Sequence, residues 1–130
     1  MLVIREKQMR AFRAYMTNRF EDRMVLHVKE YFPKEFGALG EDAVRETIRH
    51  GIDRAWAYEI AVEHDVSRYI NLMFTYGKDF DLNSALSWAA AILNDTKLSG
   101  PSRMDRLYEE AEKHLSRGAG IGNTRGPGAL

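Results

Sequence analysis

The chain contains no cysteine, carries no net charge and has no long uninterrupted apolar run. Without cysteine it can form no disulfide, no thiolate nucleophile and no cysteine-ligated zinc site. Its 19 basic and 19 acidic residues cancel, so no overall field attracts it to nucleic acid or anionic lipid. The chain reaches a charge at Arg5, too early for a signal peptide, and no later segment approaches membrane-spanning length. We therefore expect a cytoplasmic protein that binds neither nucleic acid nor membrane.

What the sequence has instead is helical periodicity, over a length of 130 residues that suits one domain. From Ile4 to Tyr31 the apolar residues recur at gaps of three or four, which predicts one long helix with one buried stripe, ended by Pro33. Periodicity and cap residues predict four further helices: one over 41–60 after turns at Gly37 and Gly40, one from a cap at Asp65 to Gly77, one capped by Asn83 or Ser84 and ending near Asn94 and Asp95, and one from Gly100 and Pro101 to Gly118.

The predicted fold is all-α, a single-domain irregular helical bundle of about five helices packed against a long N-terminal helix. This helical domain spans 1–117. The remaining segment, 118–130, is rich in glycine and can bury too little apolar surface to offset the entropy of its own ordering. We therefore expect a flexible tail there, unless a partner holds it.

The segment YGKDFDLNSA, 76–85, spaces Asp79, Asp81 and Asn83 two residues apart, as in the first half of a calcium-binding loop. Such a loop also requires glycine at its sixth position and glutamate at its twelfth, and these positions hold Ser84 and Ala90. Because both requirements of a calcium loop are missing, the segment is predicted to be a connection between two helices. Its polar side chains cap the next helix, and its acidic residues are exposed. The apolar residues between them, Phe80 and Leu82, are predicted to plug the core.

No other pattern in the chain predicts catalysis or metal binding. A metal site carried by helices needs repeated Glu-x-x-His pairs or an HExxH sequence, and neither occurs around the four histidines. The run Glu63, His64 and Asp65 alternates acid and base, but sequence neighbours do not face one another on a helix, and acids suit a helix N-terminus. No serine lies in a nucleophile elbow. We predict no catalytic, cofactor-binding or metal-binding residue.

The charges of the first predicted helix are uneven, because between Arg5 and Arg19 only Glu6 opposes the basic residues. The resulting basic face is either solvated and paired within the molecule, or a docking surface for an acidic partner. Three tyrosines at the edges of the apolar stripes are further candidates for contact. With the loop acids added, the predicted partner-binding residues are Arg10, Arg13, Tyr15, Arg19, Tyr58, Tyr76, Asp79 and Asp81.

Three blocks together resemble a known group of proteins. They are FEDRMVLHVKEYFP at 20–33, VRETIRHGIDRAWAYEIAVEHDVSRYINLMFTYGKDFD at 44–81 and WAAAILND at 88–95. The group consists of small helical bacterial proteins encoded beside the spike and effector genes of type VI secretion systems, and the resemblance covers roughly 4–107. It implies a non-enzymatic protein that binds a secreted effector or a spike component, and it implies no catalytic residue.

The resemblance leaves the role of such a protein open. The leading hypothesis is an adaptor or chaperone that holds the effector or spike component through the first helix and the loop at 77–83. The alternative is an immunity protein that neutralises a cognate toxin, in which Asp79 and Asp81 mimic a charged substrate. A small helical enzyme of unknown reaction is the third hypothesis, and homo-oligomer formation also stays open.

Overall fold

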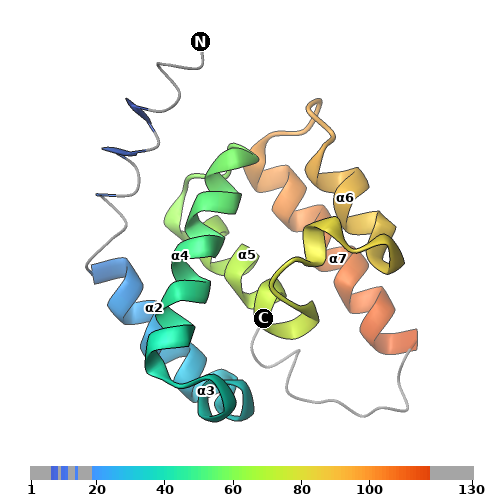
Figure 1. Cartoon of the computed structure of the whole chain (residues 1–130). Coiled ribbons are helices and arrows are strands. Elements are labelled where there is room, and N and C mark those ends of the chain that lie inside the picture. Colours follow the sequence, from blue (N-terminus) through green and yellow to red (C-terminus); the bar gives the residue numbers. More distant parts are fainter. Residues whose placement is uncertain (1–6, 9, 12–13, 15–18, 118–130) are drawn as a thin grey trace.

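The structure is a computed structural model that describes residues 7–8, 10–11, 14 and 19–117. Every regular element in 19–117 is helical, which confirms the all-α prediction (Figure 1). The elements are α2 (Arg19–Tyr31), α3 (Pro33–Leu39), α4 (Glu41–Ala57), α5 (Glu63–Tyr76), η1 (Phe80–Leu82), η2 (Ser84–Leu86), α6 (Ser87–Leu93) and α7 (Gly100–Arg117). The segment 118–130, predicted to be a flexible tail, lies outside the described residues.

Helix α5 is the central element of the bundle. It packs against α4 on one side and α7 on another, and it also contacts η1. Figure 1 shows α2, α3 and α4 gathered at one side and α6 with α7 at the other. Residues on all sides of α5 are buried, including Val66, Tyr69, Ile70 and Met73. A helix that buries residues around its whole circumference belongs in the middle of a fold, and α5 accordingly joins the two sides.

Helix α3 was not predicted, because the two glycines of 33–40 were both assigned to turns. Pro33 occupies the first turn of α3, where its missing N–H is no loss and its fixed φ favours helix. Gly37 therefore lies inside a helix, and the turn prediction there is wrong. Gly40 does form the predicted turn, with φ at +86°, a left-handed value that glycine adopts without strain.

The two ends of α5 test two predicted caps with opposite results. Asp65 does not cap the helix, since α5 begins at Glu63 and the preceding Val62 makes no side-chain cap hydrogen bond. The buried carboxylate of Asp65 instead pairs with Arg68 at 2.6 Å, because a guanidinium is a stronger partner than a backbone N–H. At the other end, Gly77 closes α5 as predicted, at φ +119°.

A clamp of charged side chains joins α2 to α4. Glu21 is buried in α2, and its two carboxylate oxygens accept hydrogen bonds from Arg49 at 2.8 and 3.0 Å and from Arg45 at 2.8 Å. Burial alone would raise the pKa of Glu21, but the hydrogen bonds and charges of Arg49 and Arg45 lower it overall. The clamp therefore keeps a buried carboxylate ionised and fixes how α2 lies on α4.

Gly51 marks the closest approach of α4 to α5. A Cβ atom at this position would lie 2.7 Å from Met73 Sδ and 2.8 Å from Ile70 Cγ1. We expect Gly51→Ala to lower the free energy of unfolding by about 1–2 kcal/mol, because overpacking outweighs the gain of about 1 kcal/mol in helix propensity. Urea denaturation measures the change. Gly37→Ala is the matched control: nothing lies within 4 Å of its Cβ position, so it should stabilise the protein. Stabilisation by both substitutions would contradict the tight contact.

Candidate functional site

Three polar side chains on one face of α4 point toward the loop that follows α5. His50, Arg54 and Tyr58 are spaced four residues apart, so they lie along one side of the helix. The loop comprises Gly77–Asn83, including the η1 turn, and it is the yellow segment between α5 and α6 in Figure 1. We call these helix residues and the loop the α4–loop site.

Asp81 is the buried centre of the α4–loop site. Its side chain is 0% exposed, its carboxylate pairs with Arg54, and the Tyr58 hydroxyl donates a hydrogen bond of 2.8 Å to Oδ2. The expectation of an exposed acid at Asp81 is therefore wrong. The loop turns as a 3₁₀-helix, which directs both Phe80 and Asp81 inward, and Arg54 with Tyr58 supplies the partners that make the burial tolerable.

The environment of Asp81 holds its partners in fixed protonation states. Burial raises the pKa of Tyr58 to about 12, and the hydrogen bond to Asp81 acts in the same direction. Burial, followed by the charge of Asp81, also raises the pKa of Tyr69, and the hydrogen bond to Asp81 raises the pKa of Arg54. At neutral pH both tyrosines therefore keep their protons and Arg54 keeps its charge. This arrangement suits a structural ion pair better than proton transfer.

Three polar atoms in or beside this ion pair have no hydrogen-bond partner among residues 19–117. They are Oδ1 of Asp81, Nε of Arg54 and the hydroxyl of Tyr69. The Tyr69 ring is held by packing instead, with its centroid 5.1 Å from that of Phe80 and 6.3 Å from that of Tyr58. Within the described chain, the cost of burying the carboxylate is therefore offset by Arg54 and Tyr58 alone.

The outer surface of the same loop presents different residues. Asp79 is 61% exposed, with Oδ1 3.4 Å from Nε2 of His50, and Leu82 is 67% exposed. The prediction that Phe80 plugs the core is confirmed, while the same prediction for Leu82 is wrong. Successive residues of a 3₁₀ turn point about 120° apart, so three in a row cannot all face inward. With Phe80 and Asp81 inside, Leu82 is left in solvent.

The loop also settles which polar atoms act as caps. The Asn83 side chain accepts a hydrogen bond of 2.9 Å from the Ala85 backbone N–H, as the predicted cap requires, although it caps the short turn η2 rather than α6. The carboxylate of Asp81 is committed to Arg54. Asp81 is therefore not available as a calcium ligand. This adds to the absence of the turn glycine and of the closing glutamate that a calcium loop requires.

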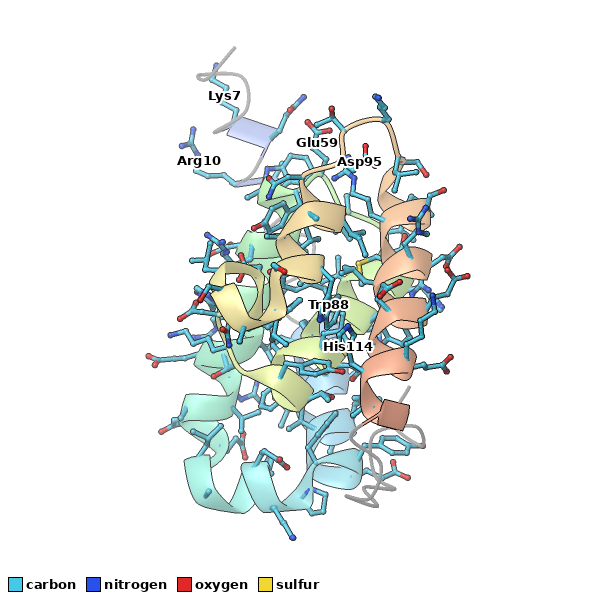
Figure 2. All side chains as sticks on the ribbon, turned by 90° about the vertical axis from the view of Figure 1, so that its right-hand side faces the viewer. Lys7, Arg10, Glu59, Trp88, Asp95 and His114 are labelled. Carbon is cyan, nitrogen blue, oxygen red and sulfur yellow. The ribbon has the colours of Figure 1, made fainter. Side chains whose placement is uncertain are left out.

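Tyr76 lies apart from this site, in an aromatic cluster between α5, α6 and α7. Its half-buried hydroxyl donates to the Ala111 carbonyl at 3.1 Å, and its ring meets Trp88 edge-on at 5.7 Å. Trp88 in turn stacks on His114 at 4.9 Å, and Figure 2 shows these two side chains facing one another. The hydroxyl of Tyr76 thus serves packing, and little of the side chain is left for a partner.

The basic residues predicted in the N-terminal segment are only partly described. Arg10 and Arg19 are exposed, and Figure 2 shows Arg10 with Lys7 beyond one end of the bundle. Arg13 and Tyr15 lie outside the described residues. The structure therefore brings together Tyr58, Asp79 and Asp81 from the predicted set, and it does not place Arg10 or Arg19 with them.

Arg54 and His50 were missed by sequence reasoning. The usable signal was the four-residue spacing of His50, Arg54 and Tyr58, which presents two basic groups and a hydroxyl on one face of a predicted helix. An acidic loop elsewhere in the chain is a natural partner for such a face. The spacing alone could not say which acids would meet it.

Across 19–117 and the five described residues before it, no group of three or more His, Cys, Asp or Glu side chains is placed to hold a metal ion. In the same part of the chain, no helix has the length and apolar character needed to cross a membrane. No family model, no curated protein and no solved structure matches this chain.

Proposed function

We propose that the chain is a non-enzymatic protein-binding module whose contact residue is Leu82, presented by the α4–loop site. The observation that carries the proposal is the contrast within three consecutive residues. Leu82 is 67% exposed, whereas Phe80 and Asp81, directly before it, are fixed in the interior. A large apolar side chain held in solvent on an anchored turn can be buried in the apolar core of an interface without disturbing the fold.

The anchoring matters because association costs conformational entropy. Phe80 is packed in the core, and Asp81 is bound by Arg54 and Tyr58, so the turn is already ordered before a partner arrives. Preorganisation of this kind removes part of the ordering cost of binding. The neighbouring Lys78 and Asp79 are exposed and supply a polar rim. We therefore expect a partner with an apolar pocket for Leu82 and a basic group beside it for Asp79.

The partner class follows from the resemblance to small helical proteins encoded beside type VI secretion genes. An adaptor or chaperone would hold a secreted effector or spike component through Leu82. The alternative, an immunity protein, draws on the exposure of Asp79, whose carboxylate is available to mimic a charged substrate. Asp81 cannot contribute to such mimicry, because its carboxylate is buried and paired.

A capture experiment tests the contact. We expect Leu82→Asp to abolish capture of the products of neighbouring genes in a pull-down. The free energy of unfolding should stay unchanged, because the Leu82 side chain is exposed and contributes little to the packing of the fold. Leu26→Asp is the matched control, since Leu26 is exposed to nearly the same extent, 64%, but lies on α2. Equal capture by both variants would remove Leu82 from the interface. Failure of the unaltered protein to capture any of these products would overturn the proposal itself.

The two roles predict different phenotypes. For an adaptor, deletion of the gene leaves the toxin lethal when it is expressed inside the cell but prevents its loading for export. For an immunity protein, co-expression abolishes the lethality of the neighbouring toxin, and Asp79→Ala restores it. Measuring toxin lethality and toxin secretion in the same strains distinguishes the two roles.

A further inference from the structure

The longest uncharged run of the sequence lies on the surface of the bundle. The run 82–94, LNSALSWAAAILN, holds no charged residue and no histidine, in a chain of which 29% is charged. It spans the end of η1, η2 and all of α6, and only Ala89 and Leu93 within it are buried. The next longest uncharged run, 69–77, covers the second half of α5, and most of it is buried. Burial accounts for the missing charges of 69–77 but not for those of 82–94.

The solvent side of α7 provides a comparison with α6. Every exposed position from 105 to 113 carries a charge, whereas the exposed positions of α6 are Ser87 and Ala91, one turn apart on one side of the helix. Depletion of charged residues is what distinguishes the centre of a protein interface from the rest of a protein surface. We call the surface of 82–94 the uncharged face. Its composition is that of a surface that another protein covers.

The side chains of the uncharged face suit contact with a second helix. The distance between two packed helices depends on the side chains at their contact, and the small Ser87 and Ala91 permit a close approach. Trp88 and Ile92 lie next to them and are half-buried, with Trp88 stacked on His114 of α7. A helix seated on Ser87 and Ala91 would therefore also cover apolar surface of Trp88 and Ile92.

From these observations we infer that the chain pairs with a second copy of itself, α6 against α6, in antiparallel orientation about a two-fold axis. Such an axis places the same patch of both copies face to face, so a charge near the axis meets a like charge. The uncharged face avoids this repulsion. The described part of the chain offers no other exposed helix face without charge over such a length.

The charges that border the uncharged face fit the antiparallel orientation. The loop before α6 carries Lys78 and Asp79, and the connection after α6 carries Asp95 and Lys97. Figure 1 shows α6 between these two segments. In an antiparallel pair the loop of one copy lies beside the connection of the other, so that Asp79 meets Lys97 and Lys78 meets Asp95. A parallel pair would instead place Asp79 against Asp79 of the second copy.

The pairing also covers Leu82, which begins the uncharged face beside Asp79. A leucine that is 67% exposed is thereby kept from non-specific contacts until a secretion partner displaces the second copy. This competition, unlike the pairing itself, rests on the proposed function.

Sedimentation of the purified full chain over a range of concentrations tests the pairing. We expect a reversible dimer, which Ala91→Arg weakens about tenfold or more, because it buries a charge in the apolar contact and brings it near its own copy. Ala38→Arg is the matched control: Ala38 is exposed on α3, so this variant should dimerise as the unaltered chain does. Thermal denaturation checks that both variants fold. A chain that stays monomeric up to about 1 mM, or a dimer that survives Ala91→Arg, would overturn the inference.

Cross-linking tests the orientation directly, because the chain contains no cysteine of its own. A disulfide needs Cα atoms within about 7 Å, and antiparallel pairing places position 87 of one copy opposite position 91 of the other. Chains with Ser87→Cys and chains with Ala91→Cys should therefore link to each other faster than either links to itself. Ala38→Cys should stay unlinked. Faster linking of like chains than of unlike chains would rule out the antiparallel orientation.

Neither assay contains another protein, so the two proposals can fail separately. A dimer that captures none of the products of neighbouring genes would overturn the proposed function alone. Capture of such a product by a chain that stays monomeric would overturn the pairing alone.

Discussion

Replacing Asp81 with alanine is expected to lower the free energy of unfolding by about 3 kcal/mol, because it removes one half of a buried ion pair. Arg54 would keep its charge without its carboxylate, and the Tyr58 hydroxyl would lose the acceptor that it now reaches at 2.8 Å. The partial exposure of Arg54 lets water compensate in part, which keeps the expected loss at the lower end for broken buried pairs. Urea denaturation at neutral pH measures the change.

Asp79 provides the matched control for this substitution, since it is an aspartate of the same loop. Its carboxylate is largely exposed and its contact with His50 spans 3.4 Å, so Asp79→Ala should leave the urea midpoint nearly unchanged. Asp81→Asn should give an intermediate loss, because an amide oxygen still accepts from Tyr58 but no longer neutralises Arg54. Equal effects of Asp79→Ala and Asp81→Ala would mean that the buried ion pair does not stabilise the loop.

The second large effect is expected from Phe80→Ala, which should lower the free energy of unfolding by about 3–5 kcal/mol. Phe80 is buried in the core beside Tyr69, so truncation loses apolar burial and leaves a cavity that the surrounding side chains fill only in part. Thermal and urea denaturation both report the change. Leu82→Ala, two residues away, should stay within about 0.5 kcal/mol of the unaltered protein. A large loss of unfolding free energy on Leu82→Ala would show that this leucine packs within the fold and is not available for contact with a partner.

The helices were predictable to the extent that local rules decide them. The three-to-four spacing that predicted a helix over 41–60 is the spacing of the buried residues Val44, Ile48 and Ile52 in α4. The end of α5 at Gly77 was predictable because glycine, which has no Cβ, adopts the positive φ of a helix stop without strain. Helix α3 was missed because two local signals disagreed. The start signal of Pro33 outweighed the turn preference of Gly37, and sequence spacing carries no measure of that balance.

The candidate site was predictable only in part, because its chemistry depends on tertiary contacts. The loop at 77–83 was identified, but its alternating polar and apolar residues suggested that all its acids face water. Arg54 lies 27 residues before Asp81, and only the packing of α4 on the η1 turn brings them together. No local pattern predicts that a guanidinium group lies in the interior beside the loop. Asp81 was therefore predicted to be exposed and Leu82 to be buried, and the structure shows the reverse.

The clamp between α2 and α4 has a further consequence for how the chain can be divided. Gly40 lies between Glu21 on one side and Arg45 and Arg49 on the other. A cut at this turn would give two fragments, one that carries Glu21 and one that carries Arg45 and Arg49. The opposite charges of the two fragments would favour their association, and the geometry of the clamp would favour the native register of α2 on α4.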